Sequence, residues 1–452
     1  MKIDDPLVRT LIEVSDARTE ELNEQLMTTT GGWVEKVSKI RDMITWLKTE
    51  GVDTDSLSKQ NMKAILESIE DADIPAAKVL SIRQAAAKSS ISKLKKMLLW
   101  ATHDRRLKNN VQYYGSHTGR WGGRGVQLQN LPRGNVSRKM FDMVIEMINA
   151  NRLHDIRVAF GEPLDVYASL IRGCLIPDDE SHKLVAGDFA QIEARVNAWI
   201  SGEDILLTEF ESKGDPYKSL ASTIFRKPIA SIGKDSFERF VGKCAVLGLG
   251  YQMGAQKFID AVIALGGPRL DLAFTTDVVR IYRNLYTNIV NNWYEVERAA
   301  KTAIKVPSTL VKCGVLEFYA TPQVLLMRLP SGRSICYPSP RLIDAPSPRG
   351  ISEKITYMGM CPFKHQWTRL ETYGGKLVEN AVQGISRDIL VEAMFRLEDS
   401  PFDTLFTVHD EIVTQSRSGT AKELEELLIV RPDWAKRCPI AAEAWSGTRY
   451  GK

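Results

Sequence analysis

The chain has 452 residues, of which 44% are apolar and 26% are charged. These proportions are ordinary for a folded globular protein, and they exclude a disordered chain, a collagen-like repeat and a small disulfide-stabilised protein. The 60 lysine and arginine residues exceed the 56 aspartate and glutamate residues by only 4, so net charge neither requires nor excludes a polyanionic partner.

Targeting and membrane signals are missing from the sequence. The 6 cysteines lie far apart without a CxxC pair, which is typical of a reducing compartment. The first residues are charged and lack the apolar core of a signal peptide. The least charged stretch, 244–256, is too short to span a bilayer. We therefore expect a soluble, cytoplasmic protein without a membrane contact.

The first hundred residues are expected to be helical. Apolar residues recur at helical spacing among many charges. We expect helices over residues 6–27, 34–48, 61–69 and 76–100. The last helix and the segment after it are basic, with Lys93, Lys96, Arg105 and Arg106. These cations indicate either a row of phosphate contacts, in which they displace counterions, or a solvated helix face.

The rest of the chain mixes strands and helices. Residues 106–134 are a polar loop rich in glycine, arginine and amide side chains. The apolar run 184–189 indicates a buried strand, and an amphipathic helix follows it to residue 200. The remaining expected elements are a mostly helical segment 206–302, a β-rich segment 309–372, a helix 376–397, a hairpin 405–413 and a last strand 439–445.

Two aspartates stand at predicted strand ends. Asp188 closes the apolar run, within Gly-Asp-Phe-Ala-Gln-Ile-Glu, and Asp410 lies at the bend of the hairpin, within Val-His-Asp-Glu-Ile-Val. An ionised carboxylate among apolar strand residues is costly unless it is paired or binds a cation. Brought together in one sheet, these two would bind Mg²⁺, which prefers oxygen ligands and keeps water sites for substrate phosphates. Either segment alone is equally compatible with a turn or capping aspartate.

A third segment combines cations, an aromatic ring and glycines. Arg239, Lys243, Leu247 and Tyr251 recur every four residues, so they lie along one stripe of a predicted helix about 18 Å long. This pattern suits a ligand with phosphates at one end and a flat base at the other. Glycines in a helix cost up to about 1 kcal/mol each, so close packing against a nucleotide or a hinge would explain them. The alternative is a glycine-rich packing helix.

Two further segments present polar side chains at ordered positions. The glycine-bounded loop 118–133 carries Arg120, Gln129 and Asn130. The sequence Lys-Leu-Val-Glu-Asn-Ala-Val-Gln, which ends at Gln383, has polar residues at i, i+3, i+4 and i+7 on an otherwise apolar helix. Arginine and amide side chains bind phosphates and the minor-groove acceptors that all base pairs share. An ordinary loop and a solvated helix face are the alternatives.

In this order and combination, the segments resemble the polymerase part of family A DNA polymerases, the bacterial DNA polymerase I type. The Asp188 segment resembles motif A, the Arg239–Tyr251 segment motif B and the Asp410 segment motif C, while the Arg120 loop resembles the motif that grips the primer–template duplex. Matches extend from about residue 80 to the C-terminus, and the wording is most similar to phage and prophage members.

The resemblance implies an α+β, right-hand polymerase fold with an antiparallel-sheet palm, helical fingers and a helical thumb. The expected thumb is 1–105, the palm 106–205 with 373–452, and the fingers 206–372 with a β-rich insertion at about 309–372. It also implies template-directed DNA synthesis from dNTPs on primer–template DNA, with two Mg²⁺ ions. We expect a monomer in the cytoplasm of a bacterial host.

The resemblance further implies a role for each site residue. Asp188 and Asp410 would hold the metals, and Glu411 would be an auxiliary carboxylate near the primer end. Arg239 and Lys243 would contact the triphosphate, and Lys243 would also be a proton donor to pyrophosphate. Tyr251 would occupy the templating position, and Glu193 would be the gate against a ribose 2′-OH. Gln191 and Leu247 are further expected nucleotide contacts beside them. The expected DNA contacts are Arg120, Gln129, Asn130, Gln383 and His409, with Lys93, Lys96, Arg105 and Arg106 on the thumb.

The sequence departs from the family pattern at identifiable places. Leu247 stands where members usually carry Phe or Tyr, so the resemblance does not transfer sugar selection at this position. Gly375 and Lys376 stand where the bacterial type has an arginine, two turns before the glutamine. The thumb-like helices begin almost at Met1, so we expect that these residues do not include a proofreading exonuclease domain. An exonuclease domain or a processivity factor would be a partner outside these residues.

Two rival functions use the same features. A single-subunit RNA polymerase shares this fold, but those enzymes lack a glutamate at the gate position that Glu193 occupies and follow the motif C aspartate with a residue smaller than Glu411. A non-catalytic protein that binds primer–template DNA would keep the fold without turnover, but it would not need both carboxylates.

Overall fold

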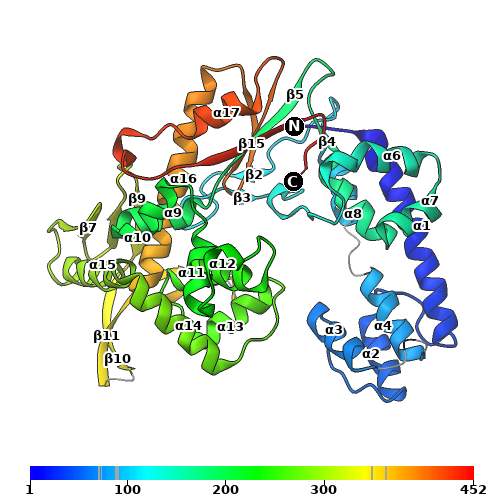
Figure 1. The fold of residues 1–452 in the computed structure, drawn as a ribbon, viewed down its shortest axis with the longest axis horizontal. Coiled ribbons are helices and arrows are strands. Elements are labelled where there is room, and N and C mark those ends of the chain that lie inside the picture. The colour runs from blue at the N-terminus through cyan, green and yellow to red at the C-terminus, as the bar shows by residue number, and fades with distance from the viewer. Residues whose placement is uncertain (70–71, 73, 87–90, 348–349, 362–363, 452) are drawn as a thin grey trace.

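A computed structural model describes residues 1–451 apart from 70–71, 73, 87–90, 348–349 and 362–363. It combines helices with antiparallel sheets, as expected for the α+β class. A four-stranded antiparallel sheet lies between two helical lobes (Figure 1). In the described residues, no helix combines the length and apolar character that crossing a bilayer demands.

The N-terminal lobe is helical. Its elements are α1 (Asp5–Thr29), α2 (Ile40–Thr49), α3 (Lys59–Ser68), α4 (Pro75–Ala86), α5 (Ile91–Trp100), α6 (Phe141–Asn149), α7 (Leu153–Phe160) and α8 (Pro163–Gly173). Helix α1 starts where the Asp4 side chain accepts a hydrogen bond from the Leu7 N–H group at 3.1 Å. It ends before Gly31 and Gly32, whose positive φ values of 59° and 87° suit glycine. Local capping therefore sets the length of the longest helix in this lobe.

The central sheet has the strand order β13-β14-β5-β15. Its strands are β5 (Lys183–Phe189), β13 (Asp403–Val408), β14 (Glu411–Ser416) and β15 (Ala442–Gly447). Short strand pairs join β1 (Lys2–Ile3) to β4 (Leu175–Ile176) and β2 (Val111–Gln112) to β3 (Gly122–Gly123). Segments more than 200 residues apart in the chain thus share one sheet.

Each face of the central sheet packs against a different core. Along β5, Leu184 and Ala186 enter the core of the N-terminal lobe, whereas Val185 and Phe189 enter the core of the second lobe. Side chains alternate between the faces of a strand, so Asp188 points to the same side as Leu184 and Ala186. The pleat therefore turns this carboxylate toward the side of the N-terminal lobe.

The second lobe contains the remaining helices and two further sheets. Its helices are α9 (Ile192–Ser201), α10 (Asp204–Glu211), α11 (Pro216–Phe225), α12 (Phe237–Leu249), α13 (Ala255–Ala264), α14 (Leu272–Leu285), α15 (Thr287–Lys305) and α16 (Gly374–Glu398), while α17 (Ala421–Leu428) packs on the central sheet against β5 and β15 (Figure 1). One sheet comprises β6 (Val311–Cys313), β7 (Leu316–Ala320), β8 (Val324–Arg328) and β9 (Ser334–Pro338), and the other β10 (Arg341–Ser347), β11 (Gly350–Met360) and β12 (Trp367–Thr372). The β-rich segment expected after residue 309 is confirmed.

Some element boundaries differ from the expected ones. The helix expected from residue 34 begins at Ile40, because residues 34–39 are not helical and the Val34 and Val37 N–H groups donate to side-chain oxygens instead. The helix expected over 76–100 is described as α4 and α5, and residues 87–90 between them lie outside the described part. Helix α8, within the segment assigned to the palm, packs against α1. The domain boundaries remain predictions.

Candidate functional site

Acidic side chains gather at one end of the central sheet. Glu411 on β14 lies directly opposite Asp188 on β5. Asp410 occupies the turn between β13 and β14, and its carbonyl oxygen accepts a hydrogen bond from the Phe189 N–H group at 3.1 Å. Asp188 and Asp410, which are 222 positions apart in the numbering of the chain, thus sit on hydrogen-bonded neighbouring segments. This is the juxtaposition that the sequence predicts.

Two more residues complete this end of the sheet. Glu443 on β15 pairs with Asp188 from the other side and is exposed. The Tyr450 hydroxyl donates to Glu411 Oε2 at 2.6 Å, and both side chains are fully buried. Burial raises the pKa of Tyr450, and the Glu411 carboxylate raises it further. The sequence did not single out Glu443 or Tyr450, because no local pattern marks them.

The carboxylates offer the oxygen donors that a hard divalent cation prefers. In the described residues, no three acidic, histidine or cysteine side chains stand close enough to form a metal site by themselves. A Mg²⁺ ion that keeps several ligand positions for water and phosphate does not need such a cluster. The donor set therefore fits Mg²⁺ bound together with a phosphate substrate.

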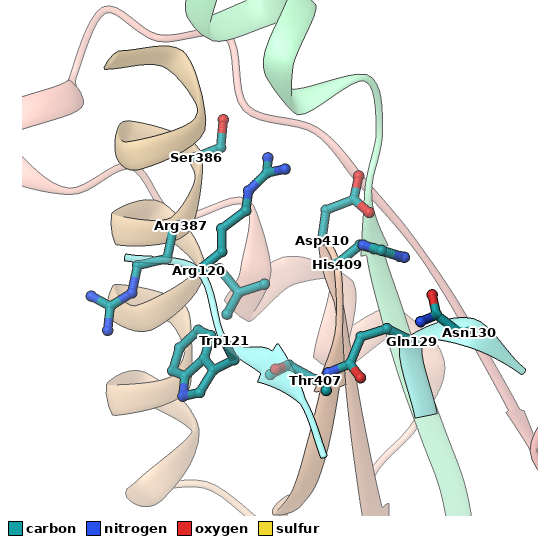
Figure 2. A pocket seen from close by; sticks show the side chains of 11 residues that line it. Arg120, Trp121, Gln129, Asn130, Ser386, Arg387, Thr407, His409 and Asp410 are labelled. Carbon is teal, nitrogen blue, oxygen red and sulfur yellow. The ribbon is translucent and has the colours of Figure 1, made fainter. Parts of the chain in front are cut away.

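A cavity of about 230 Å³ opens beside Asp410 (Figure 2). Figure 2 shows Arg120, Trp121 and Arg387 on one side of this cavity and His409 and Asp410 on the other. Its lining residues are Arg120, Trp121, Gly123, Gln129, Asn130, Ser386, Arg387, Leu390, Thr407, His409 and Asp410. The structure thus joins the polar loop, α16 and the hairpin turn, while Trp121 and Arg387 are additions that the sequence did not single out.

Local geometry positions these polar side chains. Gln129 and Asn130 lie on a short 3₁₀ helix (Leu128–Asn130), and His409 has a φ of 57°, which places its exposed side chain at the tip of a tight turn. Gln383 on α16 accepts a hydrogen bond from Thr118 Oγ1 at 3.4 Å and therefore lies beside the loop. Arg120 forms an ion pair with Glu193, so the expected groove reader and the expected sugar gate are in contact.

Helix α12 presents the expected cationic stripe only in part. Lys243 is exposed, whereas Arg239 Nε donates to Asp215 Oδ2 at 2.7 Å and its guanidinium lies over the Tyr217 ring. The helix ends at Leu249, so Tyr251 lies in the following turn, and its expected place within the helix is wrong. The helix is capped by Gly250, so the row of side chains that includes Arg239 and Lys243 does not continue along the helix to the Tyr251 ring.

A second cavity, of about 760 Å³, lies beyond the end of α12. Glu193, Leu247, Tyr251 and Glu379 line it together. Burial raises the pKa of Tyr251 well above its ordinary value, and the Glu193 and Glu379 carboxylates add to this. Gln191, in the left-handed conformation before α9, hydrogen-bonds the Tyr217 side chain instead of lining this cavity.

The basic residues near the end of the N-terminal helices mostly have partners within the protein. Lys93 Nζ donates to the Val126 carbonyl at 2.7 Å, Arg105 pairs with Asp5 at 2.9 Å, and Arg106 pairs with Asp178. Lys96 is exposed and forms no ion pair within the described part of the chain. Three of the four expected phosphate contacts thus have partners within the protein, on α1, in the loop that contains Val126 and at Asp178.

Comparison with known proteins connects this architecture to a family. The model of DNA polymerase family A matches residues 15–312. A DNA polymerase of Bacillus phage SP02 is 35% identical over 414 residues, which cover 90% of this chain and 62% of that relative. The solved POL domain of Pol1 from M. smegmatis, in complex with DNA primer-template and dNTP, is 16% identical with a TM-score of 0.64, over 99% of this chain and 67% of that one.

These matches carry different weight. The likeness to the M. smegmatis domain shows a shared fold, and it confirms the right-hand polymerase fold expected from the motifs. The family model covers more than half of the chain, including the segments of Arg120, Asp188 and Lys243. The chain is therefore a member of DNA polymerase family A.

Proposed function

We propose that the protein is a template-directed DNA polymerase that adds dNTPs to a primer 3′ end. The observation that carries this proposal is the placement of Asp188 and Asp410 on hydrogen-bonded neighbouring segments, with Asp410 lining a cavity that also contains arginine and amide side chains. The phage relative supports it, because it is itself a DNA polymerase, and so does the relative solved with primer-template and dNTP. We place the reaction in the cytoplasm of a bacterial host, with the chain acting as a monomer.

The proposed chemistry centres on the carboxylates. Asp188 and Asp410 would hold two Mg²⁺ ions, which when bound stabilise negative charge on the attacking 3′-oxygen and on the departing pyrophosphate. The hydrogen bond between the Asp410 carbonyl and the Phe189 N–H group keeps the two carboxylates on adjacent segments. Glu411, held by Tyr450, adds negative charge behind them. Catalysis is then mainly positioning and charge stabilisation.

Helix α12 supplies the cations for the triphosphate. The exposed Lys243 would contact the phosphates and give a proton to pyrophosphate. Arg239 would exchange Asp215 for a phosphate oxygen, because the guanidinium N–H groups donate to carboxylate and phosphate oxygens alike. Gln191 would not contact the nucleotide itself. It would hold the Tyr217 side chain, over whose ring the Arg239 guanidinium lies. Asp215 therefore keeps Arg239 oriented while no nucleotide is bound.

The pocket beyond α12 would receive the new base pair. Glu193 would exclude a ribose 2′-OH, while Leu247 and Tyr251 pack beside the base. Arg120 would leave Glu193 to read a minor-groove acceptor of the terminal pair, together with Gln129, Asn130, Gln383 and His409 along the duplex. Minor-groove acceptors occupy equivalent positions in all base pairs, so these contacts suit sequence-independent binding.

Primer extension tests the proposal directly. On a defined primer–template with dNTPs and Mg²⁺, we expect extension by the unaltered protein and none by Asp188→Asn or Asp410→Asn. Extension that survives both substitutions would refute the assignment. A mismatched 3′ end in the same assay shows whether these 452 residues remove a wrong nucleotide.

Nucleotide choice separates DNA from RNA synthesis. We expect the unaltered protein to prefer dNTPs and Glu193→Ala to lose part of that preference. Glu193→Gln is the matched control, since it keeps the size of the side chain and removes its charge. A protein that prefers rNTPs before any substitution would be an RNA polymerase instead.

A further inference from the structure

Arg387 occupies an unusual position beside the site. It lies on α16, lines the cavity that contains Asp410, and is only 9% exposed. Its Nε–H group is buried and has no hydrogen-bond acceptor among the residues that the structure describes. A buried donor without an acceptor costs about 1–3 kcal/mol, so the guanidinium gains free energy if it turns toward a ligand that supplies an acceptor.

The charges around Arg387 are unbalanced. The buried Asp388 carboxylate accepts hydrogen bonds from Arg333 Nε at 2.8 Å and Ser331 Oγ at 2.6 Å, while Arg387 Nη1 is 3.3 Å away. One carboxylate therefore serves two guanidinium groups, which leaves the cluster with one net positive charge. Such a cluster attracts a polyanion or a strong hydrogen-bond acceptor, particularly where little water screens it.

Aromatic rings fix the orientation of this guanidinium. The Arg387 Cζ atom is 4.7 Å from the centre of the Trp121 ring and 5.7 Å from that of Tyr113. Tyr113 is 70% exposed, so one side of this cluster faces solvent. A guanidinium that lies over a ring directs its N–H donors outward in its own plane.

We propose that Arg387 is a further DNA-binding residue, which donates a hydrogen bond to a minor-groove acceptor of the primer–template duplex, close behind the primer 3′ end. This inference rests on the proposed polymerase function. The chemistry of the cavity favours a base edge, since the same cavity presents Arg120, Gln129 and Asn130, whose side chains are donors suited to the N3 and O2 atoms of bases. His409 and Asp410 line the opposite side of the same cavity, which places the contact at the terminal base pairs.

The test measures binding without synthesis. A series of four primer–template duplexes is used. Each duplex carries one 3-deazaguanine, which lacks the N3 acceptor, at a different one of the last four base pairs. Affinity is measured by fluorescence anisotropy at one fixed salt concentration and without dNTP. The variants are Arg387→Ala and Arg387→Lys. The control is Arg396→Ala on the same helix, a half-buried arginine that donates to the Leu427 carbonyl at 3.1 Å.

We expect the unaltered protein to lose affinity wherever the analogue removes a contacted acceptor, and to lose about tenfold at the one position that Arg387 contacts, as for one charged hydrogen bond. Arg387→Ala should bind the natural duplex about tenfold more weakly and show no further loss at that position. Arg387→Lys should retain only part of the sensitivity, and Arg396→Ala all of it.

Equal weakening of every duplex by Arg387→Ala, or none, would overturn the inference, since a structural role does not depend on the position of the analogue. If the alanine variant does not fold, the dependence of affinity on the position of the analogue is measured with Arg387→Lys instead. Failure of the unaltered protein to bind primer–template at all would instead remove the proposed function, and with it this inference.

Discussion

The hydrogen bond between Tyr450 and Glu411 ties the last residues of the chain to the carboxylate site. The distance is 2.6 Å, and both side chains are fully buried. A hydrogen bond to a buried charge contributes about 1.5–3 kcal/mol, against about 0.5–1.5 kcal/mol for a neutral one. Tyr450→Phe keeps the ring contact with Phe406, at 5.4 Å, and removes only the hydroxyl. We therefore expect a loss of about 2 kcal/mol in the stability of the central sheet.

Hydrogen exchange is the appropriate measurement, because it reports the opening free energy of individual strands. In Tyr450→Phe, amides of β5 and β14 should exchange roughly 30-fold faster, which corresponds to about 2 kcal/mol. In a Glu411→Gln background the same substitution should cost only about 1 kcal/mol, since the remaining bond is neutral. Tyr337→Phe is the matched control: Tyr337 is equally buried and accepts a neutral hydrogen bond from Asn380 at 2.9 Å.

The double-mutant comparison decides whether the charge matters. If Tyr450→Phe costs the same with Glu411 and with glutamine at that position, the two groups are not coupled and the reasoning fails. The same conclusion follows if Tyr337→Phe accelerates exchange in β5 and β14 as much as Tyr450→Phe does. Loss of primer extension in Tyr450→Phe would extend the coupling from stability to catalysis.

Other predictions concern the helices around the site. Lys96→Ala should lower the slope of log affinity against log salt by about 0.9, as for one lost phosphate contact, while Arg105→Ala, whose cation pairs with Asp5, should leave it unchanged. Gly242→Ala should destabilise the contact between α11 and α12 by about 1–3 kcal/mol in thermal melts. A Cβ atom at Gly242 would lie 2.1 Å from the Tyr217 carbonyl oxygen, whereas Gly254→Ala, with nothing within 4 Å, is the neutral control. Burial raises the pKa of Glu203, so its folded state binds the proton more tightly and stability falls as pH rises through that raised pKa. Glu203→Gln should therefore melt at a higher temperature than the unaltered protein at pH 7, with a difference that shrinks toward the ordinary carboxyl pKa of 4.5. A constant difference across pH would contradict this assignment.

Much of the fold was predictable from local patterns. The apolar run that ends near Asp188, the hairpin that turns at Asp410 and the long helix that carries Gln383 all occur where the sequence places them. Each is marked by a period of apolar residues or by a turn between two such runs, and these signals depend only on neighbouring residues. The order of the motifs was sufficient to indicate the family.

The partners of individual side chains were decided only by the tertiary structure. Lys93 appeared as a phosphate contact but donates to the carbonyl of Val126, and Arg387 carried no signal although it lines the cavity beside Asp410. A local pattern records the period and propensity of one segment, whereas these contacts depend on how segments far apart in the chain pack together. The sequence thus determined which elements form and which chemistry they carry, and packing determined which groups meet.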